Sequence, residues 1–598
     1  MYLSQLKLWN FRKFGEPDDE IDLTKPNLVV DFNKGLNLLV GENDSGKSCV
    51  IDAIKLTLRT HSIEWIKVEN DDFYKDKNRL RIECHFNSLS DEEAKNFVEW
   101  LGVDGSTDPK PNLKLILDAQ RTQDRILPYE IKGGPGDDGK VISAEAREYL
   151  KTTYLKPLRD AKAELIARKN SRLSQILEGH PVFRDKENHK LVEILTEANN
   201  EIKKYFEDES DQDHNGYKIL KTLKEYLANF LSAGSGQDTR FHIDDPKLKN
   251  ILELLKLTLY DERSGLGTYN LLFIAAELLH LKRENYDGLK LGLIEEVEAH
   301  LHPQAQLRVI AALENESTTG GIQLILSTHS ANLASKVAIK KLILCYGSKL
   351  FPLGPTYTKL GETDYNFLER FLDVTKANLF FAQGIIMVEG DSENILIPTL
   401  ARLVNKDLTA HGISIVNVGG VTFLRYSKIF KRAIEQESIG LSVSIVTDLD
   451  IKPEDEGAKK GLATQTKEQK YDGQGVKTFV SPHQTFEYCL ALSLNLNNML
   501  FEAIKAAGTE MTEDGRTGKQ VDDAWTDFSD NLTPVDLAKK IYELIVQKGI
   551  SKTIIAQHLA KSIEEKSGDA IFINNLKQDE NIDYLFKAID YAETNNHN

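Results

Sequence analysis

The sequence predicts an α/β protein in which two regions of alternating strands and helices are separated by a long helical insertion. Short apolar runs alternate with helical patterns over residues 3–143 and again over 254–346. Between them, residues 144–231 show long, charged helical periodicity, and a Gly/Ser-rich stretch at 232–237 closes this segment. A further alternation begins at residue 384. Strands separated by helices imply right-handed crossovers, so we expect a parallel sheet there.

The composition is that of a large folded chain. Its 598 residues are 41% hydrophobic, which as a soft prior suggests about three to four domain-sized units. No run of about 18 apolar residues occurs and the N-terminus lacks a signal-peptide pattern, so we expect a cytoplasmic protein without a membrane-spanning segment. The four cysteines are scattered, which indicates neither a disulfide framework nor a zinc site.

The net charge of −17 does not exclude a polyanionic partner, because net charge governs solubility and steering rather than a local groove. Basic residues gather in two places. Solvated helix faces and a phosphate-contacting surface are equally compatible with both clusters. The first cluster lies within residues 151–172, and the second consists of Arg425, Lys428, Lys431 and Arg432.

Residues 41–48, with the sequence GENDSGKS, fit the pattern G-x-x-x-x-G-K-[ST]. They follow an apolar strand at 36–40 and precede a helix predicted over 47–60, which is the context that a P-loop needs. The glycines let backbone N–H groups turn toward phosphate oxygens, and the helix N-terminus adds partial positive charge. Lys47 would reach the phosphates and Ser48 would ligate Mg²⁺. The predicted nucleotide-binding residues here are Gly41, Asn43, Ser45, Gly46, Lys47 and Ser48.

Two acids follow the apolar strand at residues 291–294. Glu295 is expected to hold the Mg²⁺ shell, and Glu296, which points the other way, is expected to orient the attacking water. His329 follows another apolar strand, at 322–326, and is placed to contact a γ-phosphate. These three side chains would complete the nucleotide site.

A glycine-containing turn, Ser264 and Gly265, precedes an apolar helix predicted over 270–279, so its backbone donors are expected to cap a phosphate. The order of all these pieces resembles the ABC-type ATPase head of RecF and SMC proteins. In that family two heads sandwich ATP, which implies a homodimer or larger homo-oligomer. The signature departs from Ser-Gly-Gly-Gln, since Leu266 and Gly267 replace its last two residues.

Carboxylates follow two strands of the second α/β region, predicted at 384–388 and 443–447, where the ligand crevices of open parallel sheets lie. Unpaired acids brought together repel one another and raise their pKa values. Divalent cations relieve that repulsion, and two Mg²⁺ or Mn²⁺ ions could activate a water and stabilise the departing oxygen of a phosphodiester. The predicted metal ligands of this site are Glu389, Glu393, Asp448, Asp450 and Glu487.

This acid set resembles the Toprim domain of topoisomerases, primases and certain nucleases. Glu389 matches its first glutamate, and Asp448 and Asp450 match its Asp-x-Asp. An ABC-type head followed by a Toprim domain resembles, over essentially the whole chain, the OLD (overcoming lysogenization defect) family of ATP-dependent nucleases. Residues 154–160 and 295–303 belong to the same resemblance.

The C-terminal segment 551–560 also resembles the OLD family, and Lys552 takes the position of the family's catalytic lysine. The resemblance therefore implies a cation that stabilises charge on the phosphorane; by itself the sequence would indicate a solvated helix lysine. The family includes anti-phage effectors, some of which act with a partner protein such as the Gabija helicase or with retron components. Partner identity is not written in this chain.

The predicted organisation has four parts. Residues 1–143 form the N-lobe of the ATPase head and 144–236 a helical insertion for dimerisation or an arm. Residues 237–360 form the C-lobe, and 361–598 form the Toprim domain with a helical extension. Within that extension we expect a loop at 508–519, because glycine and polar residues concentrate there.

The leading functional interpretation is an ATP-binding and ATP-hydrolysing, metal-dependent DNA endonuclease that nicks DNA or cuts both strands. A second interpretation is an ATP-gated DNA-binding clamp or sensor whose Toprim unit does not cleave. A third is a topoisomerase-like or primase-like Toprim enzyme, although no strand-passage domain is evident. ATP and Mg²⁺ or Mn²⁺ are the cofactors that these motifs imply.

Overall fold

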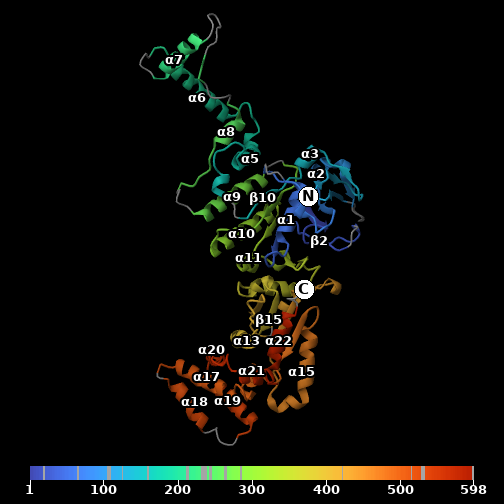
Figure 1. Ribbon diagram of the computed structural model, residues 1–598, viewed down its shortest axis with the longest axis vertical. Helices are drawn as coiled ribbons and strands as arrows, with labels where there is room; N and C mark the ends of the chain where they lie inside the picture. Colours follow the sequence, from blue (N-terminus) through green and yellow to red (C-terminus); the bar gives the residue numbers. More distant parts are fainter. Residues whose placement is uncertain are drawn as a thin grey trace.

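The structure is a computed structural model of an elongated molecule (Figure 1). The helices α6 (Lys190–Glu207) and α7 (Asn215–Phe230) lie at one end, α18 (Arg516–Thr526) and α19 (Pro534–Lys548) at the other, and three sheets lie between them. The structure describes all residues except 18–20, 63–65, 104–109, 124, 158–160, 211–214, 231–238, 242–245, 261–264, 283–285, 421, 514, 527–531 and 595–598.

The first sheet is antiparallel, in the order β2–β1–β4–β6–β8–β9, with β5 and β7 paired to β6. Alternate residues of β6, such as Leu113, Leu115 and Leu117, are buried in one core with helix α1, as expected for a strand with one covered face. The strands are β1 (Tyr2–Trp9), β2 (Leu28–Asp31), β4 (Arg79–Asn87), β5 (Leu101–Val103), β6 (Pro111–Thr122), β7 (Arg125–Ile126), β8 (Ile131–Gly133) and β9 (Lys140–Val141).

The second sheet has the order β10–β11–β12–β3–β13–β14 and is parallel except for β14. Every residue of β3, β11 and β12 is buried, which explains why these strands are mostly apolar. Strand β10 pairs with β11 at the sheet edge, although it lies inside the segment predicted to be helical. The sequence did not predict this strand, because three residues are too few to give a periodic signal. The strands are β3 (Leu36–Val40), β10 (Thr153–Leu155), β11 (Leu291–Ile294), β12 (Gln323–Ser327), β13 (Leu342–Tyr346) and β14 (Lys349–Pro352).

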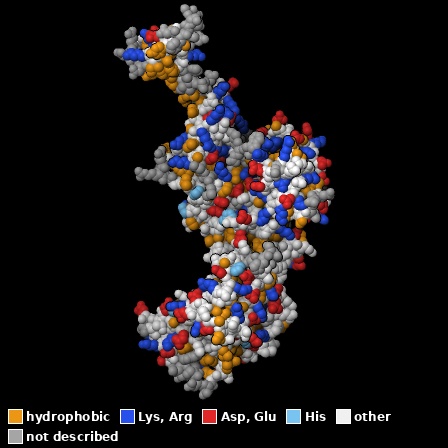
Figure 2. Space-filling model, in the orientation of Figure 1, with side chains coloured by type: hydrophobic (Ala, Val, Ile, Leu, Met, Phe, Trp, Pro, Cys, Tyr) orange, Lys and Arg blue, Asp and Glu red, His pale blue; other side chains and the backbone are white. Residues whose placement is uncertain are grey.

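Helices cover this head and extend from it. The helices α6 and α7 pack on each other and form an arm. Hydrophobic side chains gather on the arm in Figure 2, and the exposed ones include Ile194, Tyr205, Ile219, Leu223 and Tyr226. The other helices of this half are α1 (Lys47–Leu58), α2 (Asp91–Lys95), α3 (Ala144–Glu148), α4 (Ala161–Glu164), α5 (Arg172–Glu178), α8 (Leu248–Leu254), α9 (Leu266–Leu281), α10 (Pro303–Thr319) and α11 (Ala331–Lys336).

The C-terminal unit, residues 361–594, is built on a four-stranded sheet in the order β16–β15–β17–β18. All three strand pairs are parallel, which confirms the sequence prediction. The strands are β15 (Gly384–Val388), β16 (Ile413–Asn417), β17 (Ser442–Thr447) and β18 (Val476–Val480). The helices are α12 (Glu362–Phe371), α13 (Asp391–Leu403), α14 (Phe423–Lys428), α15 (Glu456–Tyr471), α16 (Phe486–Leu492), α17 (Asn497–Glu510), α18, α19, α20 (Lys552–Glu564), α21 (Ala570–Lys577) and α22 (Asp583–Glu593).

The loop predicted at 508–519 is much shorter in the structure, since α17 runs to Glu510 and α18 begins at Arg516. Two of the three glycines there, Gly508 and Gly518, serve a helix crossing. A Cβ on Gly508 would lie 3.2 Å from the backbone nitrogen of Gly518, and one on Gly518 would lie 1.9 Å from Thr509 Oγ1. Glycine therefore marks close helix packing at this point instead of a long turn.

Strand β15 has both faces buried, in two different cores. Ile385 and Met387 belong to a hydrophobic cluster that continues into the head, whereas Ile386 and Val388 belong to the core formed with α13, α20 and α22. The head and the C-terminal unit are thus joined by continuous packing. None of the described helices is both long enough and apolar enough to span a membrane.

Candidate nucleotide and metal sites

The P-loop connects β3 to α1, and two of its glycines have positive φ, 146° at Gly41 and 102° at Gly46. A Cβ on Gly41 would lie 2.3 Å from the Cys345 carbonyl oxygen, and one on Gly46 would lie 2.6 Å from Phe14 Cζ. Neither the backbone nor the space allows a side chain here. Gly46 is the N-cap of α1, so the helix begins where a phosphate would bind.

Lys47 lies inside this loop. Its ammonium donates to the Gly41 carbonyl oxygen at 2.8 Å and to Ser45 Oγ at 3.2 Å, and it also donates to the Glu42 carbonyl oxygen. Burial lowers the pKa of the ammonium. Asn43 and Ser45 line a cavity on the outer side of the loop. Phosphate oxygens would compete with the loop carbonyls for this cation.

Glu295 stands at the end of β11 and is buried. Its carboxylate accepts from the Tyr154 hydroxyl at 2.8 Å. Burial raises the pKa of Glu295, and the nearby Ser48 and Tyr154 side chains oppose the rise. The structure therefore brings together the two residues predicted to hold Mg²⁺ in the nucleotide site, and it adds Tyr154 as their support.

Glu296 follows in a left-handed conformation, with φ 44°, and is half-buried. Its N–H donates to Ser327 Oγ at 3.2 Å, at the end of the neighbouring strand β12. His329 comes two residues after Ser327. Partial desolvation is the largest cause that lowers the pKa of His329, and the nearby Lys47 ammonium adds to it. The predicted water-orienting acid and the predicted phosphate-contacting histidine therefore lie at adjacent strand ends.

Glu298 was missed in the sequence analysis as a site residue. Its carboxylate accepts from Thr328 Oγ1 at 2.8 Å and from the N–H of His329 at 2.6 Å, so it fixes the backbone that carries the histidine. The available signal was the third carboxylate within four residues, after Glu295 and Glu296. Only the tertiary structure shows that Glu298 accepts hydrogen bonds from the residues that follow β12.

Of the predicted glycine-containing turn, Ser264 lies outside the described residues. Gly265 is the N-cap of α9, and a Cβ there would meet nothing within 4 Å. The first turns of α9 pack on the segment after Glu295, because the Asn270 side chain donates to the Ala299 carbonyl oxygen and Gly267 closely approaches the His300 carbonyl oxygen. Among the residues that the structure describes, nothing therefore crowds the N-terminus of α9 at Gly265.

The C-terminal unit brings four predicted acids together, named here the carboxylate cluster: Glu389, Glu393, Asp448 and Glu487. Glu389 follows β15, and Asp448 follows the neighbouring strand β17. Glu393 lies in the first turn of α13 and Glu487 in the first turn of α16. The carboxyl ends of adjacent parallel strands thus meet two helix N-termini at one edge of the sheet.

The electrostatics of the cluster are those of crowded acids. Burial is the largest cause that raises the pKa of Asp448 to about 8, followed by the carboxylates of Glu389, Glu393 and Glu487. Burial likewise raises the pKa of Glu393 to about 7, with Glu487 and Glu389 adding to the rise and Lys552 opposing it. The charges of Glu389 and Glu487 therefore reach both Asp448 and Glu393.

Hydrogen bonds tie the cluster to the backbone. Glu389 Oε1 accepts from Thr447 Oγ1 and, at 3.2 Å, from the N–H of Asp448. Asp448 Oδ1 accepts from the N–H of Phe486 at 2.7 Å, at the start of α16. The ends of β15, β17 and α16 are therefore fixed to one another through the acids themselves.

Lys552 begins α20 and donates from its ammonium to Glu487 Oε2 at 2.8 Å. Burial alone would lower the pKa of Lys552, but the Glu487 carboxylate raises it. The side chain is still 48% exposed. The structure thus places the Lys552 ammonium against Glu487 of the cluster, while the rest of the side chain stays partly solvated.

Asp450 does not join the cluster. It is exposed, has φ 63°, and its Oδ2 accepts from Lys467 Nζ of helix α15 at 2.6 Å. The same ammonium donates to the Asp448 carbonyl oxygen. The Asp450 carboxylate is thus held by Lys467, and the left-handed backbone at Asp450 departs from the extended conformation on which a common side with Asp448 depended.

A divalent cation is the group that this donor set implies. Among the residues that the structure describes, no three carboxylate, histidine or thiol side chains are close enough to hold a metal ion as they stand. The chemistry of the cluster fits one, because buried carboxylate oxygens are the hard ligands that Mg²⁺ and Mn²⁺ take and a cation would relieve the repulsion that raises two of their pKa values. Glu389, Glu393, Asp448 and Glu487 would hold it.

Two family models match the chain. Residues 36–335, just over half of the chain, match a model described as AAA domain, AbiEii toxin, Type IV TA system. Residues 380–450 match one described as overcoming lysogenization defect protein-like, TOPRIM domain. The chain belongs to the OLD family. It joins an ATPase head to an OLD-like Toprim domain in one polypeptide.

Relatives of this OLD-family chain include two named nucleases. It is 22% identical to an endonuclease GajA of Bacillus cereus (strain HuB5-5), over 96% of this chain and 95% of the relative. It is 24% identical to the OLD nuclease of Thermus scotoductus, over 76% of this chain and 83% of the relative. A solved C-terminal region of the Xanthomonas campestris pv. campestris OLD protein is similar at 22% identity and a TM-score of 0.24, over 36% of this chain and 94% of that one.

The basic cluster of the Toprim unit (residues 361–594) in this OLD-family chain is structural. Lys428 and Arg425 face the Asp364 carboxylate, at 2.9 and 3.7 Å. Lys431 donates to main-chain carbonyls at the end of α15, and Arg432 donates to the Pro352 carbonyl oxygen at 2.6 Å. Of the two interpretations left open by the sequence, the phosphate-contacting surface is not supported for this cluster.

In the other basic stretch, several cations have acidic partners. Lys151 pairs with Glu148 and Arg168 with Glu164 along the chain. Arg172 is buried and makes a bidentate contact with the Glu277 carboxylate of α9, at 2.6 and 2.7 Å. Arg159 lies outside the described residues.

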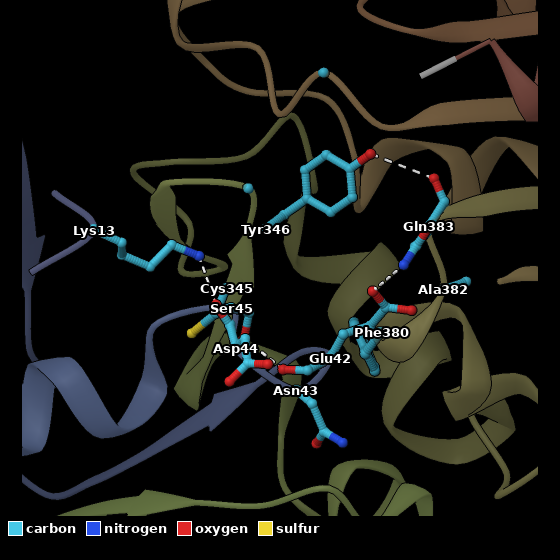
Figure 3. A pocket seen from close by; sticks show the side chains of 12 residues that line it. Lys13, Glu42, Asn43, Asp44, Ser45, Cys345, Tyr346, Phe380, Ala382 and Gln383 are labelled. Atoms are coloured by element: carbon cyan, nitrogen blue, oxygen red, sulfur yellow. Dashed lines mark hydrogen bonds between the residues drawn. The ribbon is translucent and has the colours of Figure 1, made fainter. Parts of the chain in front are cut away.

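A cavity of about 570 Å³ lies between the P-loop and the Toprim unit. Figure 3 shows Lys13, Asn43 and Asp44 on its head side and Gln383 opposite them, with Tyr346 between. Lys13 donates to the Asp44 carbonyl oxygen at 2.6 Å. The outer side of the P-loop therefore faces the start of the Toprim sheet.

Proposed function

We propose that this chain is an ATP-binding and ATP-hydrolysing, divalent-metal-dependent endodeoxyribonuclease of the OLD type that acts in anti-phage defence. The observation that carries the proposal is the convergence of Glu389, Glu393, Asp448 and Glu487 on one sheet edge with Lys552 against them. The nuclease names of two relatives support DNA as the substrate. We further propose that the protein works as a homodimer or larger homo-oligomer, with the exposed apolar residues of the arm facing a second copy.

The proposed roles follow from the contacts. A bound Mg²⁺ or Mn²⁺ supplies a polarised water and charge neutralisation at the phosphodiester. Asp448 and Glu393 would hold the cation as carboxylates, and the backbone hydrogen bond from Phe486 keeps Asp448 oriented. Lys552, beside Glu487, is placed to stabilise charge that develops on the phosphate.

In the head, Lys47 would exchange the loop carbonyls for the phosphates of ATP, and Ser48 with Glu295 would hold its Mg²⁺. Glu296 would orient the attacking water, and His329 would contact the γ-phosphate. We propose that cleavage and ATP hydrolysis use these two separate sets of residues.

The test is cleavage of supercoiled plasmid by the purified full chain with Mg²⁺ or Mn²⁺, with and without ATP. Wild-type protein is expected to nick or linearise the plasmid, and Asp448→Asn is expected to lower the rate by at least about 100-fold, because it removes a ligand charge at the cluster. Asp455→Asn, on an exposed aspartate paired with Lys459, is the matched control and should cleave normally. Cleavage by Asp448→Asn at the wild-type rate would refute the nuclease assignment. DNA binding without cleavage would instead favour an ATP-gated clamp.

A further inference from the structure

A side-chain hydrogen bond joins the P-loop to the Toprim unit across the cavity in Figure 3. Gln383 Nε2 donates to Glu42 Oε2 of the P-loop at 2.7 Å. The Tyr346 hydroxyl, at the end of β13, donates to the Gln383 carbonyl oxygen at 3.3 Å. Gln383 therefore contacts both the P-loop and the end of β13, the strand that pairs with β3 in the head sheet.

Gln383 is also fixed within the Toprim unit. Its N–H donates to the Gly412 carbonyl oxygen at 2.8 Å, just before β16. The next residue, Gly384, begins β15 so close to α22 that a Cβ there would lie 2.1 Å from the Ala592 carbonyl oxygen. Strand β15 then runs five residues to Val388, and Glu389 of the carboxylate cluster follows.

Glu42 of the P-loop contacts both Lys47 and Gln383. The Glu42 carbonyl oxygen accepts from Lys47, the cation that phosphate would draw away, while the Glu42 carboxylate holds Gln383. A change in the contacts of Lys47 therefore acts on the backbone of the residue that is bonded to the Toprim unit. Glu42 therefore connects the nucleotide site to the residue just before β15.

The intervening structure is packed, so a displacement is passed on instead of being absorbed. The hydrophobic cluster of the head continues into the face of β15 that carries Ile385 and Met387. A 3-10 helix at Lys376–Phe381, just before Gln383, contacts α11 on one side and β16 on the other. Helix α11 begins directly after His329 and Ser330. Its contact with the 3-10 helix is therefore a second connection between the nucleotide site and the Toprim unit, beside the hydrogen bond that Gln383 donates to Glu42.

We propose that Gln383 is a positioning residue that couples the state of the P-loop to the geometry of the carboxylate cluster through strand β15. Phosphate binding at Lys47 rearranges Glu42, Glu42 carries Gln383 with it, and β15 moves Glu389 relative to Asp448. This coupling rests on the proposed function only in assigning ATP binding to the P-loop and DNA cleavage to the carboxylate cluster. The contact itself is independent of whether the cluster cleaves DNA.

The test measures hydrogen–deuterium exchange of residues 384–393 in the full chain, with and without ATP and Mg²⁺. Wild-type protein is expected to change its exchange rate in this segment on adding nucleotide, and Lys47→Ala is expected to lose that change. Gln383→Met keeps the side-chain length but removes the donor, so it should lose most of the response while still folding and hydrolysing ATP. Gln469→Ala, on an exposed glutamine of α15, is the matched control and should respond normally.

Tyr346→Phe removes only the second hydrogen bond to Gln383 and should weaken the response by a smaller factor. Plasmid cleavage gives a second readout: Gln383→Met should shrink the ratio of rates with and without ATP by about 10-fold, the scale of one hydrogen bond to a charged group. An unchanged exchange response in Gln383→Met, or none in wild type, overturns the coupling. A response that depends on Gln383 in a protein that cuts no plasmid supports the coupling and refutes the nuclease function.

Discussion

Replacing Glu298 by glutamine tests whether the carboxylate that holds the loop of His329 contributes to ATP hydrolysis. Glu298 accepts two hydrogen bonds, from Thr328 Oγ1 and from the N–H of His329. Glutamine retains one acceptor oxygen and presents an amide donor to the other contact. At least one hydrogen bond to a charged group is therefore lost, which is worth about 1.5–3 kcal/mol.

Because every 1.4 kcal/mol corresponds to about a factor of ten, the expected fall in kcat is about 10- to 100-fold. KM should change little, since Glu298 contacts the histidine loop and not the P-loop. The measurement is steady-state ATP hydrolysis by the purified full chain. Glu314→Gln, on an acid of α10 paired with Lys341, is the matched control. A kcat within about twofold of wild type, or a rise in KM alone, would refute the positioning role.

Two further changes probe the Toprim unit and the base of the arm. Lys467→Ala removes a positive charge that contacts Asp450 and the Asp448 carbonyl oxygen beside the cluster, so the Mn²⁺ concentration for half-maximal plasmid cleavage should fall, by up to about fivefold because the lysine is partly exposed. An unchanged metal requirement would contradict this. Arg172→Met leaves the buried Glu277 carboxylate unpaired and should destabilise the protein by about 3–5 kcal/mol in thermal unfolding, with Glu277→Gln in the same chain restoring most of the loss. Equal melting of Arg172→Met and wild type would contradict the burial argument.

Local sequence patterns predicted the strands that position both sites. The apolar runs before Gly41, Glu295 and Glu389 are all strands of parallel sheets, because a buried parallel strand has to be apolar on both faces. The P-loop glycines were equally predictable, since positive φ and close backbone approach leave glycine as the residue that fits. Elements without a periodic signal, such as β10, were not predictable.

The tertiary structure decided which predicted residues meet. Asp448 and Asp450 were equivalent as ligands in the sequence, but a left-handed turn sends Asp450 to Lys467 and leaves Asp448 among the buried acids. Lys552 gave no signal beyond a family resemblance, and the fold places it on Glu487 across 65 residues of chain.

The sequence alone therefore predicted the two kinds of site, one for a nucleotide and one of acidic metal ligands, because each depends on a short segment at a strand end. It did not determine how they are joined. The contact of Glu42 with Gln383 links residues 341 positions apart. Such a pair leaves no local pattern, since its distance is set by the packing of two sheets and not by the spacing of residues along either strand.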